Sequence, residues 1–220
     1  ECSIQRRHQK VIEEAPSPAI DTKTRDDIGQ IASNAVSKMG YLGLGTIEFL
    51  YENNDFFFIE MNTRLQVEHP ITEAITGIDL VREQIMIAAG LPLSFKQNDV
   101  RINAHAIECR INAEDPRTFV PSPGKILQFH SPCGLGIRIE SCIYSGYEVP
   151  PYYDSLIAKL IVHGNDRDQC ILRLKQALKE IVIEPISTTI DLHRDILNTE
   201  VMKKGSYDIR WLENNLLSSA

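Results

Sequence analysis

Residues 46–62 read TIEFLYENNDFFFIEMN. Two runs rich in β-branched and aromatic residues, Thr46–Tyr51 and Phe56–Met61, flank the four turn formers at residues 52–55. This pattern predicts a β-hairpin. The number of residues in the turn decides which side chains of the two strands face each other. One register has a turn with an odd number of residues, centred on Asn54.

Two carboxylates face each other in that register. With the turn centred on Asn54, Glu48 lies directly opposite Glu60, and Asn62 shares the face of Glu60. Like charges in direct cross-strand register are destabilising, whereas Mg²⁺ is commonly held by one or two carboxylates together with phosphate oxygens. The spacing therefore predicts a metal-nucleotide site. The alternative is a solvated sheet face in a slightly different register.

The segment that follows the hairpin, Asn62–Pro70, reads NTRLQVEHP. In an extended chain Arg64, Gln66 and Glu68 project to one side. A guanidinium can hold a small planar oxyanion through two parallel hydrogen bonds, an amide can donate a third, and a nearby carboxylate can take a proton from the bound species. The pattern is typical of an anion-activation site. The alternative is a surface ion pair between Arg64 and Glu68, which contributes little.

Helical spacing is found on both sides of this central region. On the N-terminal side, apolar residues recur at helical spacing after an N-cap at Asp21 and stop at Gly40, which predicts one amphipathic helix. On the C-terminal side, a second helix is predicted over Leu80–Ala88, before Gly90 and Pro92.

From residue 101 onward the pattern changes to short strands separated by Pro and Gly. Four strands are predicted: His105–Asn112, which carries Arg110 on its polar face, Lys125–His130, Gly136–Tyr144 and Ser155–His163. A helix capped near Asp166 follows, with shorter helical patterns near 188–198 and 208–217. The loop Gln97–Val100 is the best boundary, so the sequence predicts a two-part chain of the α/β or α+β class.

The composition is that of a globular protein, with 43% hydrophobic and 24% charged residues. A net charge of -7 argues against electrostatic binding to nucleic acid or to an anionic membrane surface. No apolar run approaches the roughly 18 residues of a membrane-spanning helix. The five cysteines form no Cys-x-x-Cys motif, which favours a cytoplasmic protein without a disulfide framework.

The chain opens without Met in a dense polar string that contains Arg6, Arg7 and Lys10. These cations could neutralise a phosphate or a small anion, and the alternative is a solvated strand end. Because no cap or turn precedes the string, we expect the chain to be a piece of a longer protein.

Five motifs together resemble biotin carboxylase, a family of ATP-grasp enzymes. They follow one another in the family's order along essentially the whole chain: QRRHQK at 5–10, GTIEF at 45–49, FIEMNTRLQVEHP at 58–70, ECRINAE at 108–114 and PPYYDS at 150–155. The resemblance implies an α+β fold in two domains. Residues 1–97 would be the C-terminal part of an ATP-grasp domain, and residues 98–220 the family's C-terminal domain, a mixed antiparallel sheet with helices.

The resemblance also implies an activity, the ATP- and bicarbonate-dependent carboxylation of biotin on a carrier protein through carboxyphosphate. The implied ligands of Mg²⁺ or Mn²⁺ are Glu48, Glu60 and Asn62. The implied bicarbonate-binding residues are Lys10, Arg64, Gln66 and the backbone of Val67. The implied ATP contacts are Gln5, His8, Glu48, Leu50, Ile59 and Glu60. The implied catalytic residues are Arg64, Glu68 as the base for bicarbonate, and Arg110 as the group that stabilises the biotin enolate.

The implied partners are a biotin carboxyl carrier protein, carboxyltransferase subunits and a second copy of the chain, with Arg138 and Asp154 as dimer contacts. Because no carrier sequence follows, we favour a subunit of acetyl-CoA carboxylase, in fatty acid synthesis, over an arm of a pyruvate, propionyl-CoA or methylcrotonyl-CoA enzyme. Two alternatives remain. One is carbamoyl-phosphate synthetase, which also makes carboxyphosphate from bicarbonate, and the other is a dimerisation and carrier-docking module without activity.

The resemblance covers only about the C-terminal half of the family's domain arrangement. The N-terminal domain and the lid, with its glycine-rich loop and phosphate-binding lysines, have no counterpart in the sequence. We therefore expect the isolated chain to turn over ATP poorly or not at all.

Overall fold

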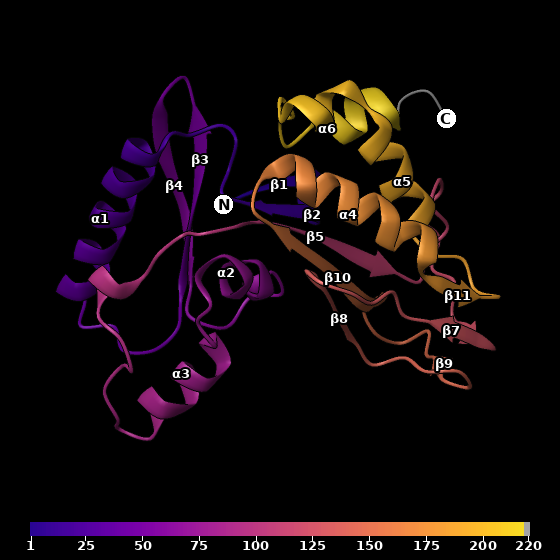
Figure 1. Cartoon of the computed structure of the whole chain (residues 1–220), viewed down its shortest axis with the longest axis horizontal. Helices are drawn as coiled ribbons and strands as arrows, with labels where there is room; N and C mark the ends of the chain where they lie inside the picture. Colours follow the sequence, from indigo (N-terminus) through magenta and orange to yellow (C-terminus); the bar gives the residue numbers. More distant parts are fainter. Residues whose placement is uncertain (218–220) are drawn as a thin grey trace. The chain divides into compact units, whose positions relative to one another are not determined.

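The structure is a computed structural model that describes residues 1–217, and its chain divides into two compact units (Figure 1). Unit 1 combines Glu1–Ser17 with the segment from Asn103 onward, and unit 2 is Pro18–Ile102. Both units contain helices and antiparallel strands, which confirms the predicted α+β class. The division into domains 1–97 and 98–220 stays a prediction, since the two units are defined by contacts in space. No helix among the described residues is both long and apolar enough to cross a bilayer.

Unit 1 is built on a five-stranded antiparallel sheet in the order β1-β2-β5-β10-β8. Its strands are β1 (Cys2–Arg6), β2 (Gln9–Ala15), β5 (His105–Asn112), β10 (Leu156–Gly164) and β8 (Ile137–Ser141). Three of the four strands predicted after residue 101 are thereby confirmed, although β8 is shorter than predicted. Strands β2 and β5 are neighbours although unit 2 separates them in the sequence. Ala15 pairs with Ala106 where the chain leaves and re-enters the sheet.

Strands β1 and β2 form a hairpin that was not predicted from the sequence. Its two-residue turn consists of Arg7 and His8, with φ of 48° and 66°. Such left-handed turns usually contain Gly, Asn or Asp. Neither residue is of that kind, so the turn gives no sequence signal. The buried carboxylates of Glu13 and Glu14 also hide the apolar alternation of β2.

Helix α4 (Arg167–Glu180) lies along one face of this sheet (Figure 1). It begins at the predicted N-cap Asp166, whose carboxylate accepts a hydrogen bond from the backbone N–H of Gln169 at 2.7 Å. Its apolar face packs into one core with the apolar side chains of β5 and β10. That face consists of Cys170, Ile171, Leu174, Ala177 and Leu178. The chain continues through α5 (Ile190–Asn198), α6 (Glu200–Lys204) and the π-helical turn η2 (Leu212–Leu216).

The strand predicted over Lys125–His130 is wrong as a single element. The structure has two short strands there, β6 (Gly124–Lys125) paired with β9 (Glu148–Val149), and β7 (Gln128–His130) paired with β11 (Val182–Glu184). The reason is a change of hydrogen-bond partner. Ile126 N–H donates to the Tyr147 carbonyl, and the next N–H, of Leu127, donates to Glu184.

Unit 2 contains α1 (Thr22–Lys38), the hairpin β3 (Thr46–Glu52) and β4 (Asp55–Asn62), α2 (His69–Thr76), α3 (Leu80–Ala88) and the short 3₁₀ turn η1 (Gln97–Asp99). The predicted N-cap of α1 is confirmed, because the Asp21 carboxylate accepts from Thr24 N–H at 2.7 Å. The predicted apolar face of α1, in contrast, is not buried. No residue of α1 is buried, and Ile31 is 62% exposed. The pattern thus predicted the helix correctly, but it did not indicate which residues, if any, pack against its apolar face.

A buried carboxylate in unit 1 joins four segments of the chain. Glu14 is fully buried and accepts hydrogen bonds from His105 Nε2 at 2.7 Å, from Tyr207 Oη at 2.6 Å and from the guanidinium of Arg167. Arg167 also donates to the carbonyls of Met202 and Lys203, at 2.6 and 2.7 Å. Burial alone would raise the pKa of Glu14, but the bonds from His105, Arg167 and Tyr207 outweigh it and hold that pKa below its usual value.

Candidate functional site

The β3–β4 hairpin confirms the predicted pairing of Glu48 with Glu60, but by a different route. The turn is not odd-numbered. It has two residues, Asn53 and Asn54, with φ of 52° and 68°, as expected for a tight hairpin turn rich in Asn. A β-bulge after Glu48 makes Ile59 an extra residue in β4 and shifts the register by one. Without the bulge Glu48 would face Ile59, so the bulge brings the two carboxylates together.

Two further side chains, Asn62 and Gln66, contact this pair. We call the four residues the hairpin cluster: Glu48, Glu60, Asn62 and Gln66. The Asn62 amide donates to Glu60 Oε1 at 2.8 Å and to Glu48 Oε1 at 3.3 Å. The Gln66 amide donates to Glu48 Oε1 at 2.7 Å. Two amides thus offset part of the repulsion between two carboxylates in direct register.

The donor set of the hairpin cluster fits a hard divalent cation. Carboxylate and amide oxygens are the ligands that Mg²⁺ and Mn²⁺ prefer. The nitrogen of the Asn62 amide, and not its oxygen, faces the carboxylates, so the amide would turn by half a rotation to act as a ligand. Within residues 1–217, no group of three or more His, Cys, Asp or Glu is placed to hold a metal ion. The hairpin cluster has two acidic residues, so oxygens of water or of a ligand would complete the coordination of an ion.

The segment after the hairpin is not extended throughout, so the predicted alternation of side chains is wrong over residues 66–69. His69 N–H donates to the Gln66 carbonyl at 3.4 Å, a turn that leads directly into α2. Glu68 is the N-cap residue of α2, and Pro70 lies in its first turn. Arg64 remains exposed and donates to the Leu65 carbonyl at 3.2 Å.

This turn places backbone N–H groups and the positive end of the α2 dipole near Val67 and Glu68, which suits an anion. The helix itself was not predicted from the sequence. The signals for it were Pro70 at a first-turn position and the apolar pair Ile71 and Ile75 at helical spacing, both of which are buried.

In unit 1, Arg110 is held by a buried carboxylate. Its Nε donates to Glu13 Oε1 at 2.5 Å, and Glu13 is 2% exposed. The Arg110 side chain itself is 19% exposed. The sequence pattern placed Arg110 correctly on its strand. It gave no signal for Glu13, because Glu13 lies in β2, and β2 was not predicted.

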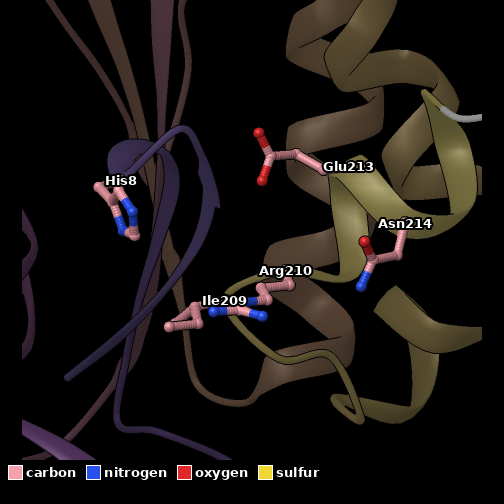
Figure 2. A pocket seen from close by; sticks show the side chains of 5 residues that line it. All are labelled: His8, Ile209, Arg210, Glu213 and Asn214. Atoms are coloured by element: carbon pink, nitrogen blue, oxygen red, sulfur yellow. The ribbon is translucent and has the colours of Figure 1, made fainter.

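The β1–β2 hairpin carries three more of the predicted site residues. Gln5 and Lys10 are direct cross-strand partners, and His8 lies in the turn. Figure 2 shows His8 across a pocket of about 320 Å³ from the C-terminal segment of unit 1. That segment contributes residues that sequence reasoning missed: Ile209, Arg210, Glu213 and Asn214. Arg7 N–H donates to Glu213 Oε1 at 3.1 Å, which ties the turn to this segment.

The structure therefore divides the predicted residues into two groups. Unit 2 brings Glu48, Glu60, Asn62 and Gln66 into contact, and it carries Arg64, Val67 and Glu68 on the adjoining turn. Two further predicted residues of this unit, Leu50 and Ile59, are 38% and 56% exposed on the hairpin. Unit 1 carries Gln5, His8, Lys10 and Arg110.

Two family models match the chain. "Carbamoyl-phosphate synthase L chain, ATP binding domain" matches residues 1–96, and "Biotin carboxylase C-terminal domain" matches residues 108–214. The first model spans the hairpin cluster, and the second spans Arg110.

Curated relatives are similar over almost the whole chain. Biotin carboxylase of Haemophilus influenzae is 59% identical over 216 residues, which is 98% of this chain and 48% of the relative. Biotin carboxylase of Pseudomonas aeruginosa is 54% identical, with the same coverage. A pyruvate carboxylase subunit from Methanothermobacter thermautotrophicus is also 54% identical, over 97% of this chain and 44% of the relative. The chain thus spans about half the length of the curated relatives it matches.

Solved structures agree with the fold. A complex of biotin carboxylase from Campylobacter jejuni superposes with a TM-score of 0.94 at 47% identity, over 97% of this chain and 48% of the other. The biotin carboxylase domain of the 2-oxoglutarate carboxylase of Hydrogenobacter thermophilus, a dimer with MgADP, ADP and bicarbonate, superposes with a TM-score of 0.95 at 46% identity, over 98% of this chain and 48% of the other.

Proposed function

This chain belongs to the biotin carboxylase family, and on that premise we propose that it supplies metal, bicarbonate and biotin residues for the ATP-dependent carboxylation of biotin on a carrier protein. The observation that carries the proposal is the hairpin cluster, in which a bulge brings Glu48 and Glu60 into register and Gln66 reaches Glu48. A cluster of this kind would destabilise an ordinary hairpin, and it suits a site that binds a cation.

We assign the metal to Glu48, Glu60 and Asn62, with Mg²⁺ or Mn²⁺ as the ion. When bound, the ion would neutralise the negative charge that develops on the phosphates of ATP during phosphoryl transfer. The Hydrogenobacter thermophilus relative, solved with MgADP, supports the use of Mg²⁺ together with a nucleotide. The nucleotide itself is assigned to Gln5, His8, Leu50 and Ile59, together with the two metal-binding glutamates.

Bicarbonate is assigned to Lys10, Arg64, Gln66 and the backbone of Val67. A guanidinium forms two parallel hydrogen bonds to a planar oxyanion, and the start of α2 adds a favourable dipole. Glu68, at the N-cap of α2, is the proposed base that takes the proton of bicarbonate. A bicarbonate oxygen then attacks the γ-phosphorus of ATP, the bond to the β-phosphate oxygen breaks, and carboxyphosphate forms as ADP leaves. Carboxyphosphate is then the source of the carboxyl group that is transferred to biotin.

Arg110 is assigned to biotin. Transfer of the N1′ proton to a phosphate oxygen of carboxyphosphate places negative charge on the ureido oxygen, and a fixed guanidinium stabilises that charge most when it is already oriented. N1′ then attacks the carboxyl carbon, and the carbon–nitrogen bond of carboxybiotin forms as phosphate leaves.

Phosphate release from MgATP tests the proposed activity. The protein to use is this chain extended upstream to the length of its relatives, with and without bicarbonate and free biotin. Release that requires bicarbonate and rises with biotin is expected. Release that is indifferent to both would contradict the proposal and would favour a carrier-docking module without activity.

The 220-residue chain alone is expected to release no bicarbonate-dependent phosphate, because it spans about half the length of its relatives. Measurable bicarbonate-dependent turnover by this chain would contradict that expectation. Calorimetric titration of the 220-residue chain with bicarbonate or with MgADP tests the alternative of a carrier-docking module without activity. Heat of binding would argue against that alternative, because it would show that the site residues bind a ligand.

Glu48→Gln is expected to weaken Mn²⁺ binding to the isolated chain by at least about tenfold. The same change is expected to leave the metal-free hairpin as stable as before or more so, because it removes a like-charge repulsion of roughly 0.2–1 kcal/mol. Calorimetric titration with Mn²⁺ and thermal melts with and without the ion measure both effects. Glu52→Gln, at the exposed end of β3, is the matched control, and equal loss of Mn²⁺ binding in both variants would refute the assignment.

The final acceptor is proposed to be acetyl-CoA, through carboxyltransferase subunits in fatty acid synthesis, with pyruvate, propionyl-CoA or methylcrotonyl-CoA enzymes as the alternative. A cytoplasmic homodimer is proposed, with Arg138 and Asp154 at its interface. The dimer of the Hydrogenobacter thermophilus relative supports that assembly. Sedimentation of Arg138→Glu and Asp154→Lys variants tests it, and wild-type sedimentation of both would contradict the assigned contacts.

A further inference from the structure

The side chain and the main chain of Arg110 are each held by buried groups of unit 1. Its Nε donates to Glu13 on the neighbouring strand at 2.5 Å. Its carbonyl accepts from His193 Nε2 at 2.7 Å and from Thr189 Oγ1 at 3.1 Å. Glu13, Thr189 and His193 are 2%, 4% and 0% exposed. Arg110 is therefore anchored at both ends.

The anchor on the main chain is rigid and uncharged. Burial lowers the pKa of His193 to about 4, although the bond to the Arg110 carbonyl opposes that shift, so the ring is neutral at pH 7. A carbonyl only accepts, which fixes the proton of His193 on Nε2. The carbonyl of Arg110 is thus held by two buried donors, and its guanidinium is held through Nε by Glu13.

Stability alone gives little reason for a carboxylate at position 13. Glu13 lies directly opposite Glu108 in the β2–β5 register, and Glu108 is fully buried as well. Like charges opposite each other in a sheet destabilise it. Replacing a buried ion pair by apolar side chains is often neutral or stabilising, so such a pair points to a need other than stability.

We propose that Glu13 is the positioning residue of Arg110, and that its carboxylate fixes the guanidinium in the orientation in which it stabilises the ureido oxygen of biotin. The inference rests on the proposed role of Arg110. Arginine has a long side chain with high rotamer freedom, so fixing it in one orientation costs conformational entropy. A partner that orders the side chain before the substrate binds removes this cost from the free energy of activation.

The test compares three substitutions at position 13 in the chain extended upstream to the family's length. Glu13→Met keeps an apolar side chain of similar length, and Glu13→Ala removes the side chain. Both are expected to lower kcat for biotin-dependent phosphate release about tenfold to a hundredfold. The KM values for ATP and bicarbonate are expected to change less than about twofold. Glu13→Gln keeps an oxygen acceptor of the same shape and is expected to recover most of the rate.

Arg110→Ala separates the positioning role from the role of Arg110 itself. If Arg110→Ala leaves the biotin-dependent rate intact, the proposed role of Arg110 is wrong. If Arg110→Ala abolishes that rate while a folded Glu13→Met or Glu13→Ala variant keeps it, only the positioning role is wrong. In the Arg110→Ala background, adding Glu13→Met is expected to lower kcat no further, and a further fall would contradict positioning through Arg110.

Folding is followed by the fluorescence of Trp211, the single tryptophan, which is buried in unit 1. Asp195→Asn is the matched control. It removes a carboxylate from another ion pair of unit 1, Arg117 with Asp195 at 2.8 Å. The control is expected to keep the wild-type kcat, and a loss equal to that of Glu13→Met would show a general effect of charge loss from unit 1 and overturn the proposal.

Discussion

Glu68→Gln is expected to lower bicarbonate-dependent phosphate release by about 10²- to 10⁴-fold, the usual contribution of a positioned general base. Glutamine has the size of glutamate and can still occupy the N-cap position of α2, but it cannot take the proton of bicarbonate. The loss should therefore fall on kcat, with little change in the KM for ATP. Initial rates of phosphate release from MgATP, at varied bicarbonate, measure it in the chain extended upstream.

Two further variants make this result specific. Arg64→Ala removes the proposed anion ligand and is expected to raise the KM for bicarbonate together with its loss of rate. Glu52→Gln removes an exposed carboxylate from the far end of β3 and is expected to keep the wild-type rate. A Glu68→Gln enzyme with an undiminished rate would show that another group accepts the proton.

Arg167→Leu is expected to reduce the free energy of unfolding of unit 1 by about 3–5 kcal/mol, the range for removal of one partner from a buried ion pair. The substitution leaves Glu14 fully buried with two of its three donor residues and frees the carbonyls of Met202 and Lys203. Urea unfolding followed by Trp211 fluorescence reports on unit 1, because that residue is the single tryptophan of the chain. Arg117→Leu breaks the exposed pair with Asp195 and is expected to reduce the free energy by no more than about 1 kcal/mol.

The acid unfolding transition tests the same network of Glu14 and Arg167. The pKa of Glu14 in the folded chain is below its usual value of 4.5, so its contribution to stability is fully present above pH 4.5 and is lost as the pH falls through the folded pKa. Arg167→Leu removes one of the groups that lower this pKa. The variant is therefore expected to lose stability at a higher pH than the wild type, and identical acid transitions would contradict the role of Arg167.

The sequence predicted the elements whose pattern is local. Helix α4, strand β5 and the β3–β4 hairpin each have a regular apolar period with a cap or turn at one end, and each was found where expected. The pairing of Glu48 with Glu60 was also predicted, although from a wrong turn length. A bulge at Ile59 compensated for that error, and bulges have no reliable signal in a single sequence.

The elements that were missed depend on partners far away in the chain. Strand β2 carries Glu13 and Glu14, which read as solvent-facing until Arg110 and Arg167 are known to meet them. The residues around His8 come from the segment that begins at Ile209, and no spacing rule relates His8 to that segment. The family motifs named the candidate site residues, while the contacts that hold those side chains required the three-dimensional fold.

The pairing of Ala15 with Ala106 describes how the chain is assembled. From the point of view of the five-stranded sheet, unit 2 is a single insertion within a β2–β5 hairpin, entered and left at adjacent positions. The entropy of closing such a loop grows only with the logarithm of its length, by roughly 0.6 kcal/mol for each doubling. The stability of the sheet therefore depends only weakly on the length of the inserted segment. A chain in which a short turn replaces Pro18–Ile102 would consist of unit 1 alone, with Glu13 still beside Arg110.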